Sequence, residues 1–236
     1  MREVISAINA AKTFNELSSE CYRYFAKRGV CHFSYFHFPP IGAIDFDDVK
    51  VIVWLGYPEA WVAAYKRTGF AYSDPIIERL LRENRPVWTK HVLGASDASP
   101  EEKAYLKLLI DCKVNDDLAV PVYGPGGRNG GYGIGFEDDA MDLSPAEIDE
   151  IQWICQKAHL KYCELLDQKL ERPPDLSARE TEVLRFVAQG RPNSTIAETM
   201  SVSIKTVETY LSRVFLKLDV GDRMTAALRA ISLGII

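Results

Sequence analysis

The sequence predicts an α+β fold in two parts: an N-terminal α/β/α sandwich with a central antiparallel sheet, and an all-α C-terminal domain of four helices. Three observations support this prediction. Strand-like and helical runs alternate over residues 1–170, short capped helices fill residues 177–236, and the proline-containing stretch ERPPD lies between them. We therefore expect domains at 1–170 and 177–236, joined by a linker at 171–176, because proline interrupts a helix.

The N-terminal part begins with helical periodicity and continues with β-rich runs. An amphipathic helix is expected over Val4–Lys27, followed by strands near Val30–Phe38 and Val49–Gly56. Caps and periodicity then predict helices over Trp61–Arg67, Ile76–Glu83, Ser99–Lys113 and Ser144–Leu170, and strands in LAVPVYG and GYGIGFE on either side of a glycine-rich hairpin turn. This order of elements is typical of a sheet covered by helices.

The C-terminal part contains the signals of a helix-turn-helix. Ser177 and Glu180 have the spacing of a capping box at the start of a first helix, and Gly190 ends that helix. A second helix fits Ser194–Met200, and Ser203 caps a third, longer one. Two short helices joined by a tight turn have the geometry of a DNA-binding helix-turn-helix.

The third helix of this part has an apolar face and a polar face. Val207, Leu211, Phe215 and Leu218 recur at three- and four-residue steps, which predicts that they face the core. Polar residues near the N-terminus of a recognition helix reach base edges in the major groove. The predicted DNA contacts on the opposite face are Lys205, Thr206 and Thr209, with Arg213 as a phosphate anchor. The alternative is a solvated polar face on a small helical bundle.

This run resembles the DNA-binding domain of LuxR-type transcription regulators. The residues that match the family pattern are Glu180, Leu184, Gly190, Ile196, Ala197, Ser203, Thr206, Val207, Leu211, Lys217 and Leu218. The resemblance implies that the domain binds a double-stranded DNA operator. Because one helix-turn-helix buries little area, we expect specific binding by a homodimer on a palindromic site.

A second informative stretch, YPEAWVAAYKRTGFAYSDPI, covers residues 57–76. Tyr57, Trp61 and Tyr65 stand at four-residue steps, so they share one face wherever a helix includes them. One interpretation is an aromatic core with Asp74 as a helix cap. The same pattern, followed by Trp88, is similar to the autoinducer-binding domain of LuxR-type regulators, so the resemblance extends over essentially the whole chain.

The resemblance implies a small-molecule signal, an N-acyl homoserine lactone, and the residue types fit its polar atoms. The Trp61 N–H can donate to the lactone carbonyl and the Tyr57 hydroxyl to the amide carbonyl, while an ionised Asp74 can accept from the amide N–H. By resemblance, Tyr65 and Trp88 line the cavity, with Trp88 beside the lactone ring. We expect binding to stabilise a compact N-terminal domain and to permit dimerisation.

Three positions depart from the family pattern. Asp117 stands where relatives carry glycine, in a strand that reads DLAVP here, and Ala119 follows two residues later. Gly133 occupies a position where relatives often have Ser or Thr to contact the acyl carbonyl or a 3-oxo group. Because Ala119 and Gly133 lack hydroxyl groups, we expect an enlarged cavity. A bulky, branched, long or aryl tail should then fit better than a short 3-oxo chain.

The sequence offers no constellation for an enzyme, a metal ion or another cofactor. Cys31 and His32 are adjacent on a predicted strand and should point to opposite faces, which argues against a catalytic pair. The histidines show no metal-ligand spacing, and GPGGRNGG lacks the Lys-Ser/Thr of a phosphate loop. The five cysteines have no pairing pattern, and no apolar run reaches the roughly 18 residues that span a bilayer. We therefore expect a cytoplasmic protein with no membrane partner.

Two alternative functions stay open. The same helix-turn-helix also follows phosphoacceptor receiver domains, which would make the chain a phosphorylation-driven response regulator. A receiver is a parallel βα repeat, however, and the acidic pair Asp47–Asp48 precedes a predicted strand instead of following one. The second alternative, suggested by Asp117, is a LuxR-type regulator that no longer depends on a ligand.

Overall fold

The computed structural model describes residues 1–45, 51–70, 74–137, 143–169 and 174–236. The chain divides into two compact units. The first comprises Met1–Phe38, Val49–Gly124 and Arg128–Lys169, and the second comprises Leu170–Ile236 with two short loop segments. The acidic pair at 47–48, the first residues of the strand expected at 49–56 and the start of the expected linker lie outside the described residues. The linker boundaries stay a prediction.

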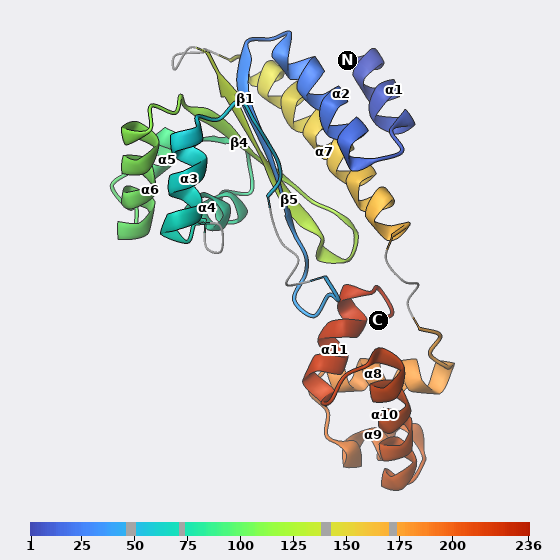
Figure 1. Cartoon of the computed structure of the whole chain (residues 1–236). Helices are drawn as coiled ribbons and strands as arrows, with labels where there is room; N and C mark the ends of the chain where they lie inside the picture. Colours follow the sequence, from blue (N-terminus) through green and yellow to red (C-terminus); the bar gives the residue numbers. More distant parts are fainter. Residues whose placement is uncertain (46–50, 71–73, 138–142, 170–173) are drawn as a thin grey trace. The chain divides into compact units, whose positions relative to one another are not determined.

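A five-stranded sheet is the centre of the N-terminal unit (Figure 1). The strands are β1 (Val30–Phe38), β2 (Val51–Leu55), β3 (Val87–Trp88), β4 (Asp117–Val122) and β5 (Asn129–Phe136). Their order is β2-β1-β5-β4-β3, and every neighbouring pair is antiparallel. This confirms the predicted antiparallel sheet and differs from the parallel sheet of a receiver domain.

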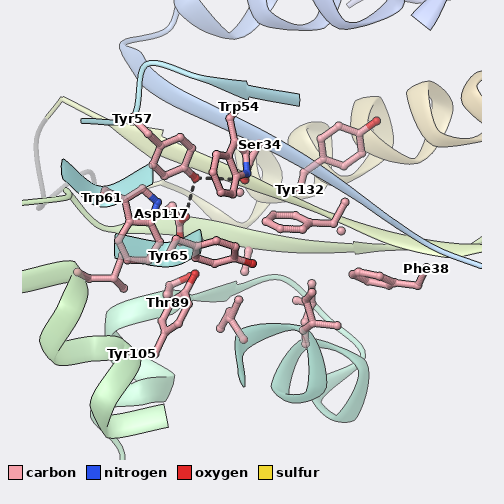
Figure 2. Close-up of a pocket in the computed structure, with 18 residues that line it drawn as sticks. Ser34, Phe38, Trp54, Tyr57, Trp61, Tyr65, Thr89, Tyr105, Asp117 and Tyr132 are labelled. Carbon is pink, nitrogen blue, oxygen red and sulfur yellow. Dashed lines mark hydrogen bonds between the residues drawn. The ribbon is translucent and has the colours of Figure 1, made fainter. Parts of the chain in front are cut away.

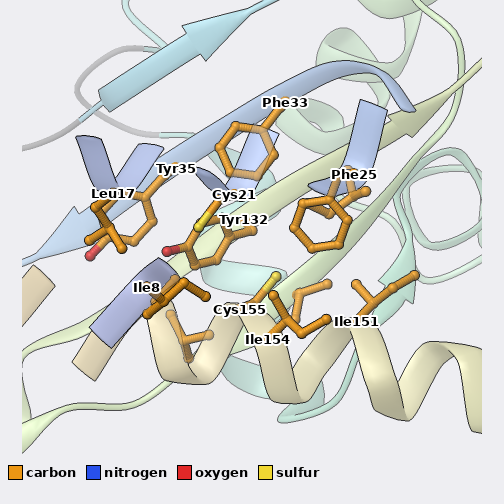
Figure 3. Close-up of a cluster of buried hydrophobic side chains, with 14 of the residues drawn as sticks. Ile8, Leu17, Cys21, Phe25, Phe33, Tyr35, Tyr132, Ile151, Ile154 and Cys155 are labelled. Carbon is orange, nitrogen blue, oxygen red and sulfur yellow. The ribbon is translucent and has the colours of Figure 1, made fainter. Parts of the chain in front are cut away.

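Helices cover both faces of this sheet (Figure 1). On one face lie α1 (Arg2–Ala10), α2 (Phe14–Ala26) and α7 (Pro145–Asp167). On the other lie α3 (Glu59–Thr68), α4 (Pro75–Glu83), α5 (Thr89–Leu93) and α6 (Pro100–Asp111). The apolar side chains between the sheet and the first group form the main core, in which Phe25, Phe33 and Ile154 are almost completely buried (Figure 3).

The structure corrects the predicted elements in two places. The helix expected over Val4–Lys27 is two helices, because Ala11 adopts an extended conformation and Thr13 caps α2 by accepting from the Glu16 amide. The short elements β3 and α5 were not predicted from the sequence. Runs of two and five residues are too short to show a period.

Alternation along β5 separates the core from the opposite face of the sheet. Tyr132, Ile134 and Phe136 pack into the main core. The intervening Gly133 and Gly135 face the other way, where a Cβ on Gly135 would lie 1.8 Å from the His32 ring and a Cβ on Gly133 would lie 2.6 Å from the Ser34 hydroxyl. Glycine in the sheet therefore makes room for side chains that cross its second face.

The C-terminal unit contains the four predicted helices: α8 (Ala178–Ala188), α9 (Asn193–Met200), α10 (Ile204–Leu218) and α11 (Arg223–Ser232). Val207, Leu211 and Leu218 of α10 are buried as predicted, but Val214 completes the buried face and Phe215 is only half-buried. The buried Glu180 accepts from the Ser177 amide and, at 2.8 Å, from Lys217 Nζ. Burial raises the pKa of this carboxyl, but these donors lower it by more, so Glu180 stays ionised.

Among the residues that the structure describes, no helix combines the length and the apolar character needed to cross a bilayer.

Candidate ligand cavity and DNA-facing helix

The candidate site is a cavity between the sheet and helices α3 to α6 (Figure 2). Its polar end is formed by Ser34, Tyr57, Thr89 and Asp117, and its apolar end by Phe36, Phe38, Ile76, Ile77 and Leu80. The free volume of the cavity is about 30 Å³. Since one water needs roughly 10–15 Å³ on that measure, the cavity holds about two waters before its side chains move.

Three aromatic residues predicted from the sequence lie together at this cavity. Trp61 and Tyr65 occupy successive turns of α3 and are buried, whereas Tyr57 precedes the helix. The Tyr57 and Trp61 rings are nevertheless stacked, with centroids 6.4 Å apart. The Tyr57 hydroxyl lies 3.1 Å from Ser34 Oγ, and the Trp61 N–H makes no hydrogen bond with any described residue. A donor therefore faces the cavity without an acceptor among the residues that the structure describes.

Asp74 is a helix cap and also the centre of a buried hydrogen-bond network. It is the N-cap of α4, and its Oδ1 accepts from the Ile76 amide at 2.9 Å. Its Oδ2 accepts from the Tyr65 hydroxyl at 2.6 Å and from the Tyr105 hydroxyl at 3.3 Å. Burial raises the pKa of Asp74 to about 7, and these donors oppose that rise. Asp74 is not itself in the cavity wall, because the two phenols lie between it and the free space.

Asp117, Ala119 and Gly133 all line the cavity. The first two point to the same face because they alternate along β4, and Gly133 pairs with Ala119 across the sheet. A Cβ on Gly133 would lie 2.6 Å from Ser34 Oγ, 2.9 Å from Asp117 Oδ2 and 3.1 Å from the Tyr57 hydroxyl. The cavity is therefore not enlarged at Gly133 as expected from the sequence, because neighbouring polar groups occupy the space that a side chain would take.

The structure does not bring Trp88 into this cavity. Its partner across β3 and β4 is Leu118, whereas Val87 pairs with the cavity residue Ala119. Because consecutive strand residues point to opposite faces, the Trp88 ring packs on the core side, with its centroid 5.9 Å from that of Phe136. The next residue, Thr89, lines the cavity in place of Trp88.

Tyr105 is a cavity residue that sequence reasoning missed. It lies on α6, its hydroxyl reaches Asp74, and its ring contacts Trp61 edge-on with centroids 5.3 Å apart. In the sequence it is an aromatic residue of an amphipathic helix, with no local pattern that links it to Asp74. Only the packing of α6 against α3 and α4 brings these groups together.

One expectation about the cysteines is corrected. The pairing register shifts between Val30 and His32, and this irregularity brings Cys31 Sγ to 3.5 Å from His32 Nδ1 instead of to the opposite face. Burial raises the pKa of the Cys31 thiol above its ordinary value, so the pair lacks the thiolate that a nucleophile requires. Within the described ranges, no group of three or more His, Cys, Asp or Glu side chains is placed to hold a metal ion.

The predicted DNA contacts lie on one side of α10. Lys205, Thr209 and Arg213 are exposed, and Thr206 is half-buried. Thr206 also completes the helix cap, because its amide donates to Ser203 Oγ at 3.0 Å and the two hydroxyls lie 2.8 Å apart. The exposed face can therefore enter a groove without disturbing the buried residues of the helix.

Two family models match the chain, one for each part. Residues 13–162 match the autoinducer binding domain, and residues 174–230 match the bacterial regulatory proteins of the luxR family. The chain belongs to the LuxR-type quorum-sensing transcription regulators. This confirms the resemblance seen in the sequence, including an N-terminal domain for a small-molecule signal and a DNA-binding domain. It also confirms that the function is not enzymatic, because the relatives are transcription regulators.

Individual relatives in this LuxR-type family are distant but match along most of their length. The transcriptional activator AnoR of Acinetobacter nosocomialis is 23% identical over 99% of this chain and 98% of its own. The quorum-sensing regulator RhlR of Pseudomonas aeruginosa is 27% identical over 86% of this chain and 84% of its own. The crystal structure of Escherichia coli SdiA covers 100% of this chain and 97% of its own at 21% identity, with a TM-score of 0.75. The structure of SdiA in complex with octanoyl-rac-glycerol has a TM-score of 0.69 at 20% identity, and it covers 98% of this chain and 93% of its own.

Proposed function

We propose that this LuxR-type regulator senses an N-acyl homoserine lactone in the N-terminal cavity and binds a palindromic operator as a homodimer in the cytoplasm. The observation that carries the proposal is the Trp61 N–H, which has no acceptor among the described residues and belongs to a ring stacked on that of Tyr57 at one cavity. Two adjacent donors fit a ligand head with two carbonyl oxygens.

In this binding mode, Trp61 donates to the lactone carbonyl and Tyr57 to the amide carbonyl. The amide N–H donates to Asp74 Oδ2 and replaces the longer of its two phenol contacts, the one with Tyr105 at 3.3 Å. Tyr65 keeps its 2.6 Å bond and holds the carboxylate in place. Each polar atom of the amide and each carbonyl then has a protein partner, which offsets the cost of burying them.

The acyl or aryl tail occupies the apolar end of the cavity. Phe36, Phe38, Ile76, Ile77 and Leu80 surround this end and offer no hydrogen-bonding side-chain group. Because the cavity has room for about two waters, a tail enters only if these side chains move apart. Binding is therefore coupled to a rearrangement of α4 against the sheet, and ligand should stabilise the N-terminal unit.

Dimerisation is proposed through α7. Trp153 and Leu160 are seven residues apart on this helix and are 48% and 42% exposed, and Lys157 Nζ lies 4.7 Å from the centre of the Trp153 ring. An exposed apolar pair on a long helix is a suitable contact for a second copy. Two copies of α10 would then read half-sites about 34 Å apart through Lys205, Thr206 and Thr209, with Arg213 on phosphate.

A ligand-independent regulator is the second candidate, and the small free space of the cavity favours it. In that case the contact between Tyr57 and Asp117, at 3.4 Å, takes the place of the ligand amide. The domain would already be compact without a signal, and operator binding would be constitutive.

Thermal melting and operator gel-shift assays of the full chain test these two candidates. We expect at least one member of a panel of acyl and aryl homoserine lactones, with octanoyl glycerol included, to raise the melting temperature and to change operator binding. Trp61→Phe removes one donor and should weaken binding by roughly tenfold, whereas Trp88→Phe, on the core side of the sheet, should leave it unchanged. Equal melting and equal operator binding with every compound would reject lactone sensing and support the constitutive regulator.

A further inference from the structure

Asp117 places a carboxylate in the cavity wall. It is the first residue of β4, points to the same face as Ala119, and has a side chain that is 14% exposed. Its Oδ2 lies 3.4 Å from the Tyr57 hydroxyl (Figure 2), which is longer than an ordinary O–H···O hydrogen bond, and 3.9 Å from His32 Nε2. The carboxylate is therefore held near the polar end of the cavity by weak contacts.

The other oxygen of Asp117 lacks a donor. Oδ1 is buried and forms no hydrogen bond with any residue that the structure describes. Thr89 Oγ1 is also buried and forms no hydrogen bond with any described residue, although the Thr89 hydroxyl is near enough to lower the pKa of Asp117. Burial raises the pKa of Asp117, and the hydroxyls of Thr89 and Tyr57 offset only part of that rise. By contrast, the Asp74 carboxylate receives three hydrogen bonds.

A ligand can supply the missing donor only if it carries one in addition to its amide N–H. An unsubstituted acyl chain has none, and a ketone at carbon 3 would place another acceptor against the Asp117 carboxylate. A hydroxyl at carbon 3 is a donor. Carbon 3 of the acyl chain is two bonds from the amide carbonyl carbon. In the proposed binding mode that carbonyl accepts from the Tyr57 hydroxyl, which lies 3.4 Å from Asp117 Oδ2. The hydroxyl and the carboxylate are therefore within reach of each other.

We propose that Asp117 selects the signal, and that this regulator responds to N-acyl homoserine lactones with a hydroxyl at carbon 3 in preference to unsubstituted or 3-oxo chains. The proposal rests on the lactone-binding mode described above. The hydroxyl donates to Asp117 Oδ1, an acceptor that no described residue satisfies. Thr89, which also lines the cavity, can in turn donate to the ligand oxygen.

Calorimetric titration of the full chain tests this with sets of three lactones: unsubstituted, 3-oxo and 3-hydroxy. The three members of a set have the same tail length, and the comparison is repeated at several tail lengths. We expect the 3-hydroxy compound to bind at least about tenfold more tightly than the 3-oxo compound, since hydrogen bonds to charged groups are the stronger ones. Asp117→Asn replaces an acceptor oxygen by a donor amide and should reverse this order. Asp117→Gly should abolish it.

Asp116→Asn is the matched control. Asp116 is the adjacent carboxylate, accepts from the Lys90 amide at 2.8 Å and does not line the cavity, so this variant should keep the order of the parent. Equal binding of the three compounds to the parent, or a hydroxyl preference that survives in Asp117→Gly, would overturn the role of Asp117 while lactone sensing stands. Failure of all three compounds to bind the parent would overturn both proposals.

Discussion

Replacing Asp74 by Asn measures how much folding stability is lost because the Asp74 carboxylate is buried without a cation among the described residues that contact it. Burial raises the pKa of Asp74 to about 7, whereas an unfolded Asp has a pKa near 3.9. The folded state therefore binds this proton more tightly, and the stability that results is fully present below pH 4 and is lost as the pH rises through 7. At about 1.4 kcal/mol per pH unit, the whole effect is about 4 kcal/mol.

Urea unfolding of the parent and of Asp74→Asn between pH 4 and pH 8.5 shows this loss directly. Asn keeps one oxygen for the Ile76 amide, and its side-chain N–H can donate to the Tyr65 hydroxyl, which then accepts. Because Asn has no charge, we expect the variant to gain stability relative to the parent as the pH rises. The gain should approach about 4 kcal/mol above pH 8. The variant should also bind lactone more weakly, because a side-chain N–H donor then faces the ligand amide N–H in place of a carboxylate oxygen.

Glu147→Gln is the control for this experiment. Hydrogen bonds from Ser144 hold the pKa of the exposed Glu147 below its ordinary value, so the effect of this substitution should be constant between pH 5 and pH 8. A difference between Asp74→Asn and the parent that is flat over the same range would refute the argument. So would a variant that is less stable than the parent at pH 8.

Three further predictions concern other parts of the chain. Gly133→Ser should cost about 1–3 kcal/mol of stability in urea unfolding and weaken lactone binding, because its Cβ would lie 2.6 Å from Ser34 Oγ; unchanged stability and affinity would contradict the close packing. Burial lowers the pKa of His159 to about 4, so the parent should lose about 3 kcal/mol of unfolding free energy as the pH falls from 6.5 to 4. A His159→Gln variant whose stability depends on acid pH in the same way as that of the parent would contradict this. Arg213→Ala should weaken binding to all DNA sequences alike and reduce the slope of log affinity against log salt by about one, whereas a loss confined to the operator would place Arg213 on a base.

Most of the fold could be predicted from the sequence because its signals are local. Capping boxes at Ser144 and Ser177 place two helix starts correctly, since a cap depends on residues only three positions apart. The apolar period of α10 identified three of its four buried residues. The break between α1 and α2 was missed, because the amphipathic pattern continues across it while Ala11 leaves the helical conformation.

The candidate site was predictable in part, and the reason is geometric. The residue types at Tyr57, Trp61 and Asp74 determined by themselves which ligand atoms this chain can satisfy, because an indole only donates and an ionised carboxylate only accepts. The face to which each strand residue points is decided by the pairing of β3 with β4, and this pairing turns Trp88 away from the cavity. The tertiary structure alone places Tyr105 on Asp74 and fills the space at Gly133 with Asp117, because these contacts join residues far apart in the chain whose distances no local pattern sets.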